Sequence, residues 1–205
     1  MKPYFLPSLT FAVFLWQCAS AFASGNDPWA QSYKLEQGGL YAQAAAVLDP
    51  LVARQPPHEF ALLRHAWLNY LQGSHNEAVH KYTAALKVNP RSLDARLGLT
   101  LPLLAQQRWG EAAYHAKQVL AVSPWDYLAN VRLMICEEGE RKWEDLAKHA
   151  AEVALRYPAD ATVLVYLARA EAWLGHAGKA KTAYLQVLER IPGHVEATNF
   201  LKRNP

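Results

Sequence analysis

The most restrictive feature of this sequence is a set of prolines that recur every 34 residues. They are Pro56, Pro90, Pro124, Pro158 and Pro192. Proline has no backbone N–H and cannot continue a helix, so prolines in fixed register mark the same boundary in every repeat. A period of this length is typical of architectures in which each repeat is one supersecondary unit. The spacing predicts five tandem units within residues 24–205: 25–58, 59–92, 93–126, 127–160 and 161–194.

The second unit, residues 59–92, shows what a repeat contains. Small residues at its positions 8, 20 and 27, Ala66, Ala78 and Ala85, would let two helices approach closely. Gly73 lies between the two helical stretches, where a left-handed residue can end a helix. This pattern resembles the tetratricopeptide repeat. The resemblance implies an all-α fold, a right-handed superhelix (α-solenoid) of five helix–turn–helix units, with residues 195–204 as a short capping helix.

Several residues depart from the repeat pattern. The turn glycine is replaced by Gln107 in the third unit and by Arg141 in the fourth, where Gly139 comes two places early. Pro50 and Pro102 lie inside predicted helices. Since an interior proline kinks or breaks a helix, we expect local irregularity at both positions without loss of the repeat.

The N-terminal residues have the features of an export signal. Lys2 precedes a mostly apolar stretch that ends in two small-x-small sequences, 19–21 and 21–23. This pattern is typical of a secretory signal peptide, which we place at residues 1–23. The apolar stretch is short for a membrane span, which takes about 20 residues, and an uncleaved membrane anchor is the alternative. The style of signal and repeat resembles periplasmic assembly factors, so we expect an exported, periplasmic protein.

Charge and cysteine content restrict the partner further. The formal net charge is +3, and loss of Lys2 with the signal would leave +2. So small an excess argues against a nucleic-acid partner, which requires a basic surface. Cys136 would be the only cysteine of the mature chain, so we expect no intramolecular disulfide and a buried thiol that packs as a small apolar group.

The resemblance also indicates where a partner would bind. In tetratricopeptide repeats the first helix of each unit lines a concave groove, with positions 2, 5, 9, 12 and 13 facing inward. The predicted groove residues are Tyr33, Phe60, Trp67, Tyr70, Leu101, Leu104, Ile135, Glu138, Arg169 and Trp173. Exposed aromatic rows mark binding sites. Four position-5 residues are expected instead in the seam between successive first helices: Leu63, Leu97, Val131 and Val165.

The sequence contains no recognisable catalytic motif. Glu111 and His115 are four residues apart, as are Asp145 and His149, and we interpret both pairs as solvated helix pairs rather than metal ligands. The lysine and asparagine with which some tetratricopeptide proteins hold a carboxylate are missing from positions 5 and 9. We therefore predict a non-enzymatic protein that needs no metal or cofactor and lacks that carboxylate clamp.

Taken together, these features predict an exported scaffold or adaptor that binds a peptide segment or helix of another protein in the concave aromatic groove. Assembly of an envelope complex is the expected setting. The alternative is an accessory role in exopolysaccharide secretion, where exported tetratricopeptide proteins recur and where aromatic faces can stack on sugar rings. A partly apolar C-terminal end would also leave room for oligomerisation.

Overall fold

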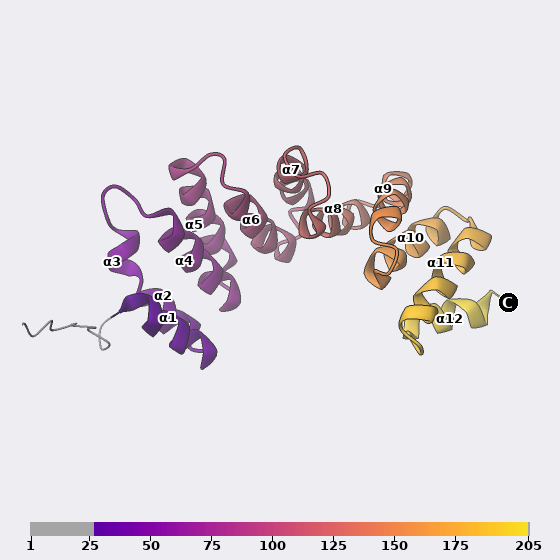
Figure 1. Ribbon diagram of the computed structural model, residues 1–205, viewed down its shortest axis with the longest axis horizontal. Coiled ribbons are helices and arrows are strands. Elements are labelled where there is room, and N and C mark those ends of the chain that lie inside the picture. The colour runs from indigo at the N-terminus through magenta and orange to yellow at the C-terminus, as the bar shows by residue number, and fades with distance from the viewer. Residues whose placement is uncertain (1–26, 205) are drawn as a thin grey trace, which may run out of the picture.

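The computed structural model describes residues 27–204 as a row of helices that follow one another along an arch (Figure 1). Within these residues there is no strand. The predicted signal peptide, residues 1–23, lies outside the described part of the chain. The all-α solenoid of paired helices is confirmed.

Each unit contributes a first and a second helix. The first helices are α1 (Pro28–Gln37), α4 (Glu59–Leu71), α6 (Leu93–Ala105), α8 (Tyr127–Gly139) and α10 (Ala161–Trp173). The second helices are α5 (His75–Val88), α7 (Trp109–Leu120), α9 (Trp143–Arg156) and α11 (Ala177–Arg190), while α2 (Tyr41–Ala46) and α3 (Asp49–Val52) share this place in the first unit. A last helix, α12 (Val195–Arg203), ends the row.

Neighbouring units pack through the second helix of one unit against the first helix of the next, and also through their first helices. Helix α4 contacts α6, α6 contacts α8, and α8 contacts α10, in addition to the contacts of each helix with the next along the chain. In Figure 1, α7 and α9 lie along the outer edge of the arch, and α8 and α10 lie nearer its inner side. The first helices are therefore the elements that present side chains to the inner face.

Small residues make this close packing possible. In the second unit the predicted contact residues Ala66, Ala78 and Ala85 are fully buried. The residues at the same positions of the fifth unit, Ala168, Ala180 and Val187, are fully buried as well. The core is divided into clusters that join adjacent units, as expected for a fold in which each repeat contacts only its neighbours. Cys136 belongs to one of these clusters, and burial raises the pKa of its thiol to about 12.

The two interior prolines affect their helices differently. Near Pro50 the second helix of the first unit is divided into α2 and α3, as the sequence predicted. Pro102 lies inside α6, which is not interrupted there. Arg132 of α8 supports this helix from outside, because its Nη1 donates to the carbonyl oxygen of Leu97 and to the hydroxyl of Thr100.

Candidate binding groove

Aromatic side chains gather at the N-terminal end of the inner face. Helices α1 and α4 bring together Trp29 and Phe60, whose ring centroids are 5.1 Å apart, and α4 alone places Trp67 and Tyr70 at 5.7 Å. Phe60 and Tyr33 are 48% and 45% exposed. The predicted aromatic row is thus a real cluster that spans two units.

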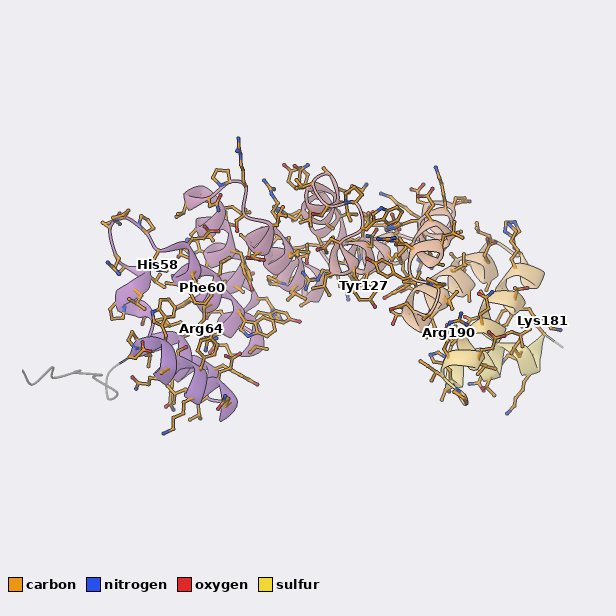
Figure 2. The ribbon with its side chains drawn as sticks, in the orientation of Figure 1. His58, Phe60, Arg64, Tyr127, Lys181 and Arg190 are labelled. Carbon is orange, nitrogen blue, oxygen red and sulfur yellow. The ribbon has the colours of Figure 1, made fainter. Side chains whose placement is uncertain are left out.

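This cluster surrounds a cavity of about 310 Å³. Its walls come from α1, α4, α5 and α6, and consist of Tyr33, Phe60, Leu63, Arg64, Trp67, Tyr82 and Asp94. Figure 2 shows Phe60 and Arg64 on the N-terminal arm of the arch. The volume lies at the lower end of the range found for ligand pockets and is large enough for one long side chain of a partner.

Arg64 and Glu36 hold the cavity walls in position. The guanidinium of Arg64, a residue that is 6% exposed, donates from Nη1 to Oε2 of Glu36 at 2.8 Å and from Nε to the Ser32 hydroxyl at 3.1 Å. It also lies over the ring of Tyr33, 3.4 Å from the ring centroid. The other oxygen of Glu36 accepts the indole N–H of Trp67 at 2.7 Å. One carboxylate therefore fixes both the buried cation and the orientation of Trp67.

Towards the middle of the arch the predicted groove is aliphatic. Leu101, Leu104 and Ile135 are half-buried, and Leu104 packs against a core cluster. Of the predicted seam residues, Val165 is buried in the C-terminal core, whereas Leu63 packs against two core clusters and also lines the cavity. The middle of the inner face is less accessible than its N-terminal end.

Near the C-terminal end Trp173 is the most accessible of the predicted groove residues. It is 67% exposed, and its ring stacks on that of Trp143 at 5.0 Å with the planes 5° apart. Trp143 and Trp109 occupy the same position of neighbouring units, and each packs against a neighbouring helix. Trp109 does so against Gly139, where an added Cβ would come within 2.6 Å of the indole ring.

Glu138 and Arg169, the two charged residues of the predicted groove, are part of a larger network. Arg169 lies 3.3 Å from Glu138 and also binds Glu196 of α12 with two hydrogen bonds of 2.8 and 2.7 Å. Tyr184 donates its hydroxyl proton to Glu196 at 2.7 Å. The hydrogen bonds from Arg169 hold the pKa of Glu196 below its usual value. These charges are satisfied within the protein, and they connect α8, α10 and α12.

His149 on the second helix α9 differs from the sequence interpretation. His149 does not pair with Asp145. Its Nδ1 lies 2.8 Å from a carboxylate oxygen of Glu137, and its Nε2 lies 2.9 Å from the amide oxygen of Asn130. The interpretation of a solvated pair is wrong for His149, because this ring points inward between α8 and α9. Residues 27–204 contain no group of three or more His, Cys, Asp or Glu that could hold a metal ion.

Three cavity residues were not singled out from the sequence. Asp94 occupies position 2, an inward position in the repeat pattern, and this position could have identified it. Tyr82 reaches the cavity from α5 because Gly98 has no side chain: a Cβ there would lie 2.2 Å from its ring. Arg64 lies at position 6, outside the inward set, and only its contacts with the first unit reveal it.

No helix within residues 27–204 is long and apolar enough to cross a membrane. Neither a protein-family model nor a curated protein matches the sequence. Similar solved structures exist nevertheless. MamA of Desulfovibrio magneticus RS-1 is 17% identical with a TM-score of 0.75, over 82% of this chain and 95% of that one.

Two further structures resemble the chain to a comparable degree. YrrB, a TPR protein with an unusual peptide-binding site, is 16% identical with a TM-score of 0.74, over 85% of this chain and 90% of its own. TTC0263, a thermophilic TPR protein of Thermus thermophilus, is 16% identical with a TM-score of 0.60, over 85% and 96%. The chain therefore has the fold of the tetratricopeptide repeat (TPR) proteins.

Proposed function

We propose that this protein is a non-enzymatic scaffold that binds a segment of another protein along its inner face. The observation that carries the proposal is the cavity bounded by Tyr33, Phe60 and Trp67, whose rings are held in place yet accessible. Tryptophan and tyrosine contribute most to binding when they are rigid and lie in a pocket. The half-buried leucines along the middle of the groove would extend the contact.

The peptide-binding site for which YrrB is described supports this choice of ligand, since the two chains share the arrangement of their helices. We further propose that residues 1–23 direct export, that the mature protein acts in the periplasm, and that its partner takes part in assembly of an envelope complex. N-terminal sequencing of the mature protein tests the first point. A sequence beginning at Met1 would favour the uncleaved anchor instead.

The decisive experiment is capture of partners from an envelope extract by three proteins: wild type, Phe60→Ala and Tyr114→Ala. Both rings are about half-exposed, at 48% and 57%, but only Phe60 lines the cavity. We expect a specific protein to be lost with Phe60→Ala and kept with Tyr114→Ala. Equal capture by all three would place the partner outside the groove, and retention of polysaccharide without any protein would favour the role in exopolysaccharide secretion.

A further inference from the structure

One carboxylate on the cavity wall has no partner among residues 27–204. Asp94 is exposed, and it forms no ion pair or hydrogen bond with any residue of the described range 27–204. It lies in the first turn of α6, two residues after the N-cap position, from which Asp126 caps α8 and Asp160 caps α10. In α6, however, Ser92 accepts the bond from the Ala95 amide. The side chain of Asp94 is thus not needed as a cap.

The other ionisable groups of the cavity leave a negative balance. The charge of Arg64 is compensated by Glu36 at 2.8 Å, and its guanidinium is covered by Tyr33. Tyr82 is neutral at physiological pH, as any tyrosine is, and burial raises the pKa of its hydroxyl further, to about 12. Asp94 is therefore the one uncompensated charge among the cavity residues.

The remaining walls favour a cation as well. Faces of tryptophan, tyrosine and phenylalanine attract lysine and arginine heads electrostatically. The methylene stem of such a side chain packs well on apolar surfaces while its head stays near a charge or water. Phe60, Leu63 and Trp67 offer the apolar surface, and Asp94 offers the charge. An acidic side chain would be repelled here, and an apolar one would desolvate Asp94 without compensation.

We propose that the cavity recognises a basic side chain, lysine or arginine, of the partner segment, with its cationic head at Asp94 and its stem against Phe60 and Trp67. This inference rests on the proposed function and adds the chemistry of the ligand to it. The partner would present this basic residue next to apolar residues that lie along Leu101 and Leu104.

Selection from a random twelve-residue peptide library displayed on phage tests the inference on the intact protein. We expect the selected peptides to be enriched in lysine or arginine beside apolar residues. For a synthetic peptide of the selected sequence, Asp94→Asn should weaken binding about three- to tenfold, as should replacement of the basic residue by norleucine. Asp145→Asn is the matched control, because Asp145 is an exposed acid in the first turn of α9 and does not line the cavity.

The outcomes separate the two proposals. Peptides that depend on Phe60 but lack basic residues, or that bind Asp94→Asn as well as wild type, would overturn the basic-residue inference and leave the groove as the binding site. Peptides whose binding is unaffected by Phe60→Ala would overturn both proposals. A selection that yields no binding peptide would also count against both.

Discussion

At the scale of single residues, the turn between the two helices of a unit demands one backbone conformation. Gly73 and Gly175 have φ values of 85° and 78°, and Gln107 and Arg141, at the same position, have 58° and 57°. All four turns form the same pair of backbone hydrogen bonds. In one bond of the pair, the N–H of the left-handed residue donates to the carbonyl oxygen three residues earlier, as Gly73 does to Tyr70 and Gln107 to Leu104. The geometry of the repeat is therefore kept even where the residue is unfavourable for it.

Replacement of Gln107 by glycine should raise stability, because a side chain in the left-handed region costs about 1–2 kcal/mol, partly offset by the greater freedom of glycine when unfolded. We expect a net gain of about 0.5–1 kcal/mol in the free energy of unfolding, measured by urea denaturation. Gln106→Gly is the control, since Gln106 has a φ of −90° and gains no relief. A Gln107→Gly protein no more stable than wild type would contradict the strain argument.

His65 should make the protein sensitive to mild acid. Its Nε2 bonds to Asp49 at 3.1 Å, and its Nδ1 lies 2.7 Å from the amide nitrogen of Asn69, which can only donate. The ring is therefore neutral in the fold, and burial lowers its pKa from the ordinary 6.5. Because the unfolded state binds the proton more readily, the free energy of unfolding has its full value above about pH 6.5 and falls as the pH drops below that value.

Urea denaturation at about pH 7.5 and pH 5.5 checks this expectation. The wild type should lose stability between the two conditions, and His65→Gln should lose less, because glutamine keeps a donor for Asp49 without titrating. An equal loss in the two proteins would assign the acid sensitivity to other groups.

At the scale of elements, α5 and α6 are held together by a contact that only a glycine at position 98 permits. An added Cβ on Gly98 would lie 2.2 Å from the buried ring of Tyr82. We expect Gly98→Ala to lower the free energy of unfolding by about 1–3 kcal/mol, the usual cost of overpacking. Gly178→Ala in α11 is the control, because nothing lies within 4 Å of its added Cβ. Stability equal to wild type would mean that the two helices can separate without cost.

The sequence predicted the helices well and their contacts less well. Prolines in register and small residues such as Ala66 and Ala85 are local signals that recur in every unit, so they define where helices begin, end and meet. Gly98 and Gly139 carry no such signal. Their role depends on which ring lies opposite, Tyr82 or Trp109, and that is set by how the helices cross. The same limit hid the contact of Arg64 with the first unit.

Helix α12 should detach from the solenoid in acid. Its Glu196 is held by Arg169, whose hydrogen bonds lower the carboxyl pKa. A lowered carboxyl pKa means that the stabilisation is present above the ordinary value of 4.5 and is lost as the pH falls through the lowered one. Glu196→Gln should mimic this at neutral pH. Hydrogen exchange should then accelerate in α12 but not in α8, and Glu189→Gln, which changes only an exposed pair, should leave α12 protected.

At the scale of the whole molecule, the hydrophobic core of the arch is divided among neighbouring units. The stability of the arch is the sum of units and of interfaces between neighbours, so local damage should stay local. The cavity, however, is built across three successive units, with Tyr33 from α1, Phe60 and Trp67 from α4, and Asp94 from α6. The ability to bind a partner therefore depends on the stacking of units as well as on the residues that touch it.

Glu36→Gln should separate these two properties. Among residues 27–204, the carboxylate of Glu36 is the one acidic partner of buried Arg64, and it also orients Trp67. Its loss therefore leaves a buried cation without compensation, at a cost on the order of 3 kcal/mol. We expect faster hydrogen exchange in α1–α3, unchanged exchange in α8–α11, and loss of peptide binding although every cavity side chain is still present. Lys34→Gln, on the same helix but exposed and outside the cavity, should change neither. Uniformly faster hydrogen exchange along the whole chain would show instead that the arch unfolds as one unit. Peptide binding that is retained although α1–α3 exchange faster would show that Tyr33 is dispensable.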